Sequence, residues 1–190
     1  MGQRSIVPLV ESSSTVKVKK VFRSGDHPRI YIPRLIVKKT AEHLRKYGAQ
    51  GNEGLVFWAG IEVGDGSKFV TTCVYPRVRW ASGASVSSDV IAGAEVVREV
   101  RRRGLEIIAE IHSHPGHWVG HSIIDDKNPF VLAKGNISIV VPCLGDEGME
   151  PLWKCGVYLY SVKDGWRRLS KGETVERFVV VDEEIALERG

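Results

Sequence analysis

The feature that most constrains the fold is an uninterrupted apolar segment at residues 54–61, with the sequence Gly-Leu-Val-Phe-Trp-Ala-Gly-Ile. Apolar side chains that do not alternate with polar ones indicate a β-strand that is buried on both of its faces. Such a strand needs other elements to cover each side of its sheet. We therefore expect residues 54–61 to lie inside a sheet that helices cover on both faces.

The rest of the chain predicts elements that would complete this arrangement. Further strands are expected at residues 29–32, 68–75, 105–111, 136–142, 153–162 and 166–169. Helices are expected from Pro33 to Tyr47, from about Ser87 to Gly104, and from about Ile123 onward. The segment after Gly172 fits a last strand or a short helix. Since strands and helices alternate irregularly and several turns resemble hairpins, the expected class is α/β (α+β), a mixed β-sheet sandwiched by helices.

Length and composition favour one globular domain. The chain has 190 residues, of which 43% are hydrophobic and 26% charged, and such a composition argues against a disordered protein. We expect the domain at residues 29–170, between a polar N-terminal arm at residues 1–28 and a C-terminal tail at residues 171–190 that packs on the domain.

Charge and cysteine content exclude several classes of protein. The net charge of +4 is small, and the one dense basic run, at residues 101–103, ends a predicted helix, where cations complement the helix dipole. We therefore expect no nucleic-acid partner. Without an apolar segment that could span a bilayer or direct secretion, we also expect a cytoplasmic protein with no membrane partner. The cysteines are odd in number and include no Cys-x-x-Cys pair, so we expect each to be a small buried apolar residue: Cys73, Cys143 and Cys155.

Two histidines at the end of a predicted strand indicate a metal site. His112 and His114 are two residues apart, and the period of a strand places their side chains on one face. Pro115 ends the strand and turns the chain. Two imidazoles on one face are suited to hold a transition metal.

A third ligand is expected where the chain folds back. Ser122-x-x-Asp125 has the form of a helix start, with Ser122 as the N-cap and Asp125 at the third helical position. Two histidines and one carboxylate leave a fourth tetrahedral position open to water, which is the ligand set of a catalytic zinc ion. Zinc lowers the pKa of a bound water to about 7, so hydroxide becomes available at neutral pH.

Hydrolysis also requires a general base that is not a metal ligand. Glu53 stands at the start of the apolar strand, where a carboxylate costs desolvation energy unless it has a partner or a purpose. Glu110 is the competitor, because it shares strand parity with His112 and His114, and it could instead orient an imidazole. The residues alone leave both assignments open.

The motif His112-Ser113-His114-Pro115, followed by Ser122-x-x-Asp125, resembles the signature of the JAMM (MPN-plus) zinc metalloproteases, and the stretch from Glu53 to Gly60 matches an earlier part of their pattern. The resemblance covers residues 29–169 in element order and implies the MPN/cytidine-deaminase-like architecture. It implies one zinc ion held by His112, His114 and Asp125.

The resemblance also implies catalytic roles and substrates. Glu53 would activate water and then protonate the leaving amine, and Ser122 would donate a hydrogen bond to the tetrahedral oxyanion. The family members that this compact, prokaryotic-type chain looks like suggest an isopeptidase or peptidase, cutting after the C-terminus of a ubiquitin-like protein in deconjugation or precursor processing. Its partners would be that protein, its conjugates and possibly conjugation-system enzymes. A small-molecule amidase or deacetylase with the same zinc chemistry, and a non-catalytic MPN scaffold, are the alternatives.

Three further residues lie in the loop between the ligands. We expect His117 and His121 to be solvated, with substrate contact or an additional ligand as the alternative. Trp118 is either buried or exposed along a substrate groove. Trp58 and Phe57, in contrast, are expected in the core.

Overall fold

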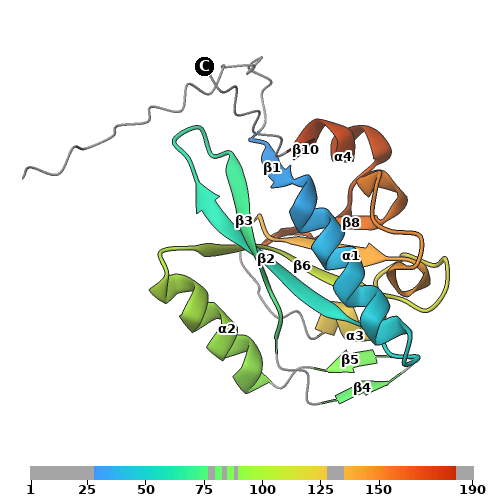
Figure 1. Ribbon diagram of the computed structural model, residues 1–190. Coiled ribbons are helices and arrows are strands. Elements are labelled where there is room, and N and C mark those ends of the chain that lie inside the picture. The colour runs from blue at the N-terminus through green and yellow to red at the C-terminus, as the bar shows by residue number, and fades with distance from the viewer. Residues whose placement is uncertain (1–27, 77–79, 83–84, 88–89, 128–134, 183–190) are drawn as a thin grey trace, which may run out of the picture.

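A computed structural model describes residues 28–76, 80–82, 85–87, 90–127 and 135–182, which build one mixed sheet of eight strands and a separate two-stranded ribbon (Figure 1). The large sheet has the order β10-β1-β3-β2-β6-β7-β8-β9. Its strands are β1 (Ile30–Pro33), β2 (Leu55–Glu62), β3 (Lys68–Val74), β6 (Glu106–Ser113), β7 (Ile137–Val141), β8 (Gly156–Ser161), β9 (Gly165–Arg168) and β10 (Phe178–Val181). The ribbon pairs β4 (Trp80–Ser82) with β5 (Ser85–Ser87). The helices are α1 (Arg34–Gly48), α2 (Val90–Arg102), α3 (Ile123–Lys127) and α4 (Lys171–Arg177), with 3-10 turns η1 (Cys143–Gly145) and η2 (Leu152–Lys154).

Strand β2 lies inside the sheet, and its residues 55–60 are buried on both faces as the sequence predicts, whereas Ile61 at the end of the apolar segment is exposed. Val56 and Trp58 pack in the cluster that contains the apolar stripe of α1. Leu55 and Phe57 point the other way and pack with Val100 of α2. Helices therefore cover both faces of a mixed sheet, which confirms the expected fold class (Figure 1).

A hydrogen-bond relay fixes α1 on the sheet. The indole Nε1 of Trp58 donates to Thr40 Oγ1 at 2.8 Å, and Thr40 Oγ1 donates to the carbonyl oxygen of Ile36 at 2.8 Å. Trp58 and Thr40 are both 0% exposed, so the relay satisfies polar groups that would be costly to bury alone.

Several elements differ from their predicted form. Ser87 belongs to β5, and the helix that was expected to begin there begins at Val90. Strand β8 begins at Gly156, since the residues before it form η2. The segment after Gly172 contains most of the helix α4 and then the strand β10, which runs parallel to β1 and pairs Phe178 with Ile30. Residues 1–27 of the predicted N-terminal arm, and 183–190 of the predicted tail, lie outside the described residues.

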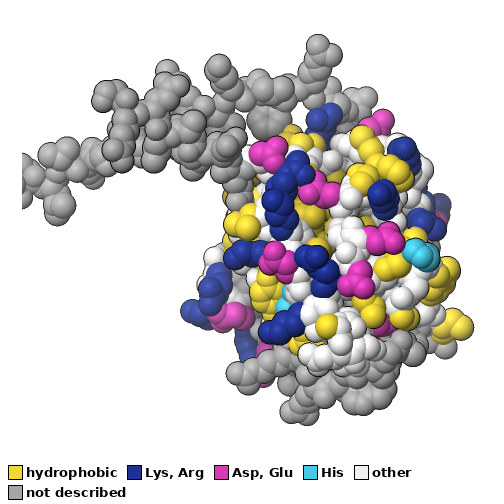
Figure 2. All heavy atoms as spheres, turned by 45° about the vertical axis from the view of Figure 1, so that its right-hand side comes forward, with side chains coloured by type: hydrophobic (Ala, Val, Ile, Leu, Met, Phe, Trp, Pro, Cys, Tyr) yellow, Lys and Arg dark blue, Asp and Glu magenta, His cyan; other side chains and the backbone are white. Residues whose placement is uncertain are grey.

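Charges of both signs mix on the surface. Figure 2 shows Lys and Arg side chains interspersed with Asp and Glu on the face that it draws. At the end of α2, Glu99 pairs with Arg102 at 2.9 Å and with Arg103 at 2.7 Å, so part of the basic run is neutralised locally. Among the described helices, none has both the length and the apolar character needed to cross a membrane.

Candidate metal centre

The two predicted histidine ligands lie at the carboxyl end of strand β6, where His112 belongs to the strand and His114 directly follows its last residue. His112 pairs with Leu55 of β2 and with Val140 of β7, so its side chain shares the sheet face of Leu55. The side chains of His112 and His114 are 9% and 8% exposed. The carboxyl ends of strands are the common location of ligand sites in sheets that helices cover.

Ser113, between the two histidines, ties this strand end to its neighbour. It is 0% exposed, and its Oγ accepts a hydrogen bond from the amide of Gly54 at 2.9 Å. The amide of Ser113 in turn donates to the carbonyl oxygen of Gly54 at 3.2 Å. These two hydrogen bonds fix the backbone between His112 and His114 against the start of β2. This positioning role of Ser113 was not predicted from the sequence.

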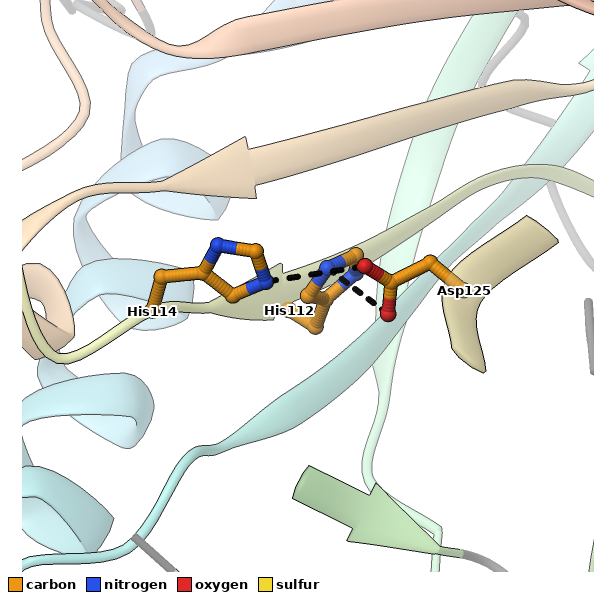
Figure 3. A group of neighbouring side chains, drawn as sticks. All are labelled: His112, His114 and Asp125. Atoms are coloured by element: carbon orange, nitrogen blue, oxygen red, sulfur yellow. Dashed lines mark ion pairs between the residues drawn. The ribbon is translucent and has the colours of Figure 1, made fainter. Parts of the chain in front are cut away.

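The third predicted ligand reaches the histidines from α3. The Ser122 amide donates to Asp125 Oδ2 at 2.6 Å, and the Asp125 amide donates to Ser122 Oγ at 3.2 Å. This reciprocal capping box holds the carboxylate at the first turn of the helix. Asp125 Oδ1 lies 3.5 Å from His112 Nε2, and Asp125 Oδ2 lies 3.6 Å from His114 Nε2 (Figure 3).

The donor atoms fit a divalent transition metal. One atom from each residue can be chosen so that all three lie within 4.8 Å of one another, and tetrahedral N and O ligands of zinc are about 3.4 Å apart. His112 Nε2 is buried, and no described residue gives it a hydrogen bond, a costly state that a metal ion would relieve. His114 Nδ1 lies 3.2 Å from the carbonyl oxygen of Trp118, an acceptor that places the proton on Nδ1 and leaves Nε2 able to bind a metal.

The electrostatics of the site favour a bound cation. Burial lowers the pKa of His112, but the contact with the charged Asp125 outweighs it, and the charges of Glu110 and Glu53 add to the effect, so the pKa is raised. Burial raises the pKa of Asp125, but its contacts with His112 and His114 outweigh this and hold that pKa well below its ordinary value. The Asp125 carboxylate is therefore ionised at neutral pH, as a metal ligand must be.

The two candidate bases both lie near the ligands. Glu53 is 6% exposed and immediately precedes Gly54, whose amide and carbonyl bond to Ser113 at the end of β6. Glu110 is also 6% exposed and sits two residues before His112 on the same face, opposite Ser138 of β7. Each carboxylate acts on the pKa of His112, so the structure brings both to the site.

His121 is not the solvated loop residue that the sequence suggested. Its side chain is 5% exposed, and its ring stacks on Tyr158 with 3.7 Å between centroids. Nε2 lies 3.0 Å from Ser138 Oγ, and Nδ1 lies 3.0 Å from Asp126 Oδ1. Burial lowers the pKa of this imidazole more than the neighbouring carboxylates raise it. The expectation was wrong because the loop folds back over the aromatic side chains of β8 and β9.

Strand β8 clamps this loop against the sheet. The hydroxyl of Tyr158 donates to the carbonyl oxygen of Val119 at 3.1 Å and accepts from the amide of His121 at 3.1 Å. Beside it, a Cβ on Gly156 would lie 1.9 Å from the same Val119 oxygen. The loop that contains Val119 and leads to Ser122 and the helix of Asp125 can therefore approach β8 only because residue 156 is glycine.

Gly156→Ala should accordingly displace the loop. The added methyl group overlaps backbone, so we expect a loss of about 1–3 kcal/mol in the free energy of unfolding, and metal affinity lower by about 10–100-fold because the ligand support moves. Chemical denaturation and competition with a chromogenic zinc chelator measure the two effects. Gly64→Ala is the matched control, since a Cβ there meets nothing within 4 Å; equal behaviour of the two variants would contradict the clamp.

Two loop residues next to His114 are exposed. His117 faces solvent as expected, and Trp118 is 59% exposed while its ring stacks on His114 at 5.1 Å between centroids.

Of the cysteines, only Cys155 is buried. Cys143 departs most from the expected buried apolar residue, because its Sγ lies 3.2 Å from His117 Nδ1 at the surface.

Known proteins resemble this chain in sequence or in fold. Over 143 residues the chain is 30% identical to the probable metalloprotease y4jG of Sinorhizobium fredii, an alignment that covers 74% of this chain and 86% of the relative. The solution structure of a protein from Desulfitobacterium hafniense has a TM-score of 0.58 at 19% identity, covering 81% of this chain and 94% of that one. A Salinibacter ruber protein has a TM-score of 0.50 at 16% identity, covering 84% and 95%. No protein-family model matches the chain.

Proposed function

Because the chain belongs to the family of the probable metalloprotease y4jG, we propose that it is a zinc-dependent peptidase whose metal is held by His112, His114 and Asp125. The observation that carries the proposal is the convergence of these three side chains around a buried imidazole nitrogen, His112 Nε2, that no described residue hydrogen-bonds. A metal ion bound there would offset the cost of burying this nitrogen without a hydrogen bond.

The remaining polar residues of the site suit amide hydrolysis. Zinc in such a site supplies Lewis-acid chemistry and makes hydroxide accessible at neutral pH. Glu53 is proposed to accept the proton of the attacking water and to deliver it to the leaving amine. Ser122 Oγ accepts a hydrogen bond from the Asp125 amide, so its own proton can be donated to the carbonyl oxygen as negative charge develops there.

We propose further that the scissile bond follows the C-terminus of a ubiquitin-like protein, in a conjugate or a precursor. The support is the match of His112-Ser-His-Pro and Ser122-x-x-Asp125 to the JAMM pattern. Exposed apolar side chains of Trp118 and Ile123 flank the ligands, at 59% and 71% exposure, and they offer contact area to an extended peptide. A small-molecule amidase is the second candidate, because α3 ends at Lys127 and β7 begins at Ile137, which leaves no long insertion for gripping a second protein.

Metal removal and a choice of substrates test these proposals together. Dialysis against a chelator should abolish cleavage, and stoichiometric zinc should restore it. The substrates are ubiquitin or a ubiquitin-like protein fused to a reporter, an unfolded polypeptide, and a panel of acylated amines. Cleavage of fusions alone supports the ubiquitin-like substrate, while cleavage of acylated amines alone replaces it with the amidase. Unchanged hydrolysis after verified metal removal would falsify the metallopeptidase itself.

A further inference from the structure

We propose that His117, Cys143 and Glu147 form a second metal site, which binds a zinc-like divalent ion on the outer side of the loop that follows His114. One donor atom from each of the three lies within 4.8 Å of the others. None of the three belongs to the centre formed by His112, His114 and Asp125, and the proposal does not depend on peptidase activity.

The backbone brings the three residues together. His117 lies in the loop between β6 and α3. Cys143 begins η1, separated from the end of β7 by Pro142, and Glu147 follows about one turn later. The Cys143 amide donates to the carbonyl oxygen of Gly116 at 2.9 Å, next to His117. Two segments far apart in the chain are thus already joined where the donor side chains meet.

The backbone at Cys143 is unusual. Its φ is +52°, as is that of the next residue, Leu144, in the left-handed region that non-glycine residues rarely adopt. Such a strained conformation tends to persist at functional sites. Here it directs the thiol toward His117 and Glu147.

The distances and donor types match zinc. Cys143 Sγ lies 3.2 Å from His117 Nδ1 and 3.8 Å from Glu147 Oε1, and the last two atoms are 4.0 Å apart. With a Zn–S bond of about 2.3 Å and Zn–N or Zn–O bonds of about 2.1 Å, tetrahedral donors are about 3.4–3.6 Å apart, so the observed distances lie on either side of that value. A thiolate with an imidazole selects zinc over magnesium or calcium.

The site differs from the first in exposure. The side chains of His117 and Glu147 are 82% and 60% exposed, which leaves a coordination position open to water and makes the ion exchangeable. Burial raises the pKa of the Cys143 thiol, and the charges of Glu147 and Asp146 add to this. A thiol that binds a metal ion releases its proton on binding.

An ion bound at this second site would affect the first metal centre through the loop that joins His114 to His117. His117 is followed by Trp118, whose carbonyl oxygen lies 3.2 Å from His114 Nδ1 and whose ring stacks on the His114 ring. Holding His117 to Cys143 restrains this segment, so the second ion is expected to stabilise the orientation of His114.

Cobalt substitution tests the second site separately from the first. A cobalt ion bound by Cys143 produces a thiolate-to-cobalt charge-transfer band, which the sulfur-free set of His112, His114 and Asp125 does not. Titration of the metal-free, reduced full chain with Co²⁺ should produce this band. Cys143→Ser should abolish the band and bind one cobalt ion fewer. Cys73→Ser, a half-buried cysteine elsewhere, should retain it, and so should His112→Ala.

Variants at the two exposed ligands separate loss of a ligand from a folding defect, which Cys143→Ser alone could also cause. His117→Gln and Glu147→Gln change side chains that are mostly solvent-exposed, and each should weaken the cobalt affinity reported by the band by at least about 10-fold. No band in the wild-type titration, a band that survives in Cys143→Ser, or unchanged affinity in both exposed variants would overturn the site. Loss of the first centre alone lowers the number of bound cobalt ions by one and spares the charge-transfer band, so failure of the proposed function is distinguishable.

Discussion

Asp125→Asn is expected to abolish the proposed peptidase activity and to remove one equivalent of zinc from the purified protein. The substitution keeps the size of the side chain but removes the charge that faces His112 and His114 at 3.5 and 3.6 Å. Losing a direct ligand should weaken zinc binding by more than the roughly 10–100-fold that outer hydrogen-bond partners contribute. Elemental analysis and chelator competition measure the affinity, and the reporter-fusion assay measures turnover.

A distant aspartate provides the control for charge. Asp164→Asn makes the same chemical change in the turn between β8 and β9, where Asp164 Oδ2 accepts a hydrogen bond from Ser161. It should leave zinc content and turnover unchanged. If Asp125→Asn kept its zinc and its activity as Asp164→Asn does, Asp125 could not be a ligand.

Glu53→Gln is the second large expected effect, because it should remove proton transfer without removing the metal. General acid–base catalysis contributes about 10²–10⁴-fold, so kcat should fall by that factor while zinc content stays at the wild-type value. The glutamine is close in size to the glutamate, which is 6% exposed, and the fold should be retained. Steady-state kinetics and metal analysis on the same preparation are the measurements.

Glu110→Gln is the matched comparison, since it changes an equally buried carboxylate that also acts on His112. A residue that only orients an imidazole should lower metal affinity by about 10–100-fold and leave kcat at saturating zinc nearly unchanged. Zinc affinity should fall in Glu110→Gln and stay at the wild-type value in Glu53→Gln. The opposite outcome would reverse the two roles.

The metal ligands could be predicted because local rules determine their geometry. A strand period places His112 and His114 on one face, and a capping box positions Asp125, as the bonds between Ser122 and Asp125 show. Strand β2 was predictable for a similar reason, since an apolar segment without alternation requires cover on both sides. These features depend on residues within a few positions of one another.

What the sequence analysis missed depends on contacts between distant segments. The burial of His121 requires Tyr158, and the approach of the loop requires Gly156; neither follows from spacing along the chain. The short strands β4 and β5 have too few residues for a periodic pattern. For α4 a local pattern did exist, because Ser170 and Glu173 form a capping box. The sequence Ser-x-x-Glu therefore favours a helix over a strand directly after Ser170.

The parallel pairing of β10 with β1 has a consequence for the order in which the protein is assembled. Ile30, in the first described strand, pairs with Phe178, in the last, so the sheet is completed across nearly the whole length of the described chain. During synthesis from the N-terminus, the edge of β1 that pairs with β10 stays unpaired until the residues of β10 have been synthesised. Such long-range pairing slows folding, and an open strand edge invites association with other chains. The metal ligands all lie between these two strands, so their segment is synthesised before the sheet is complete.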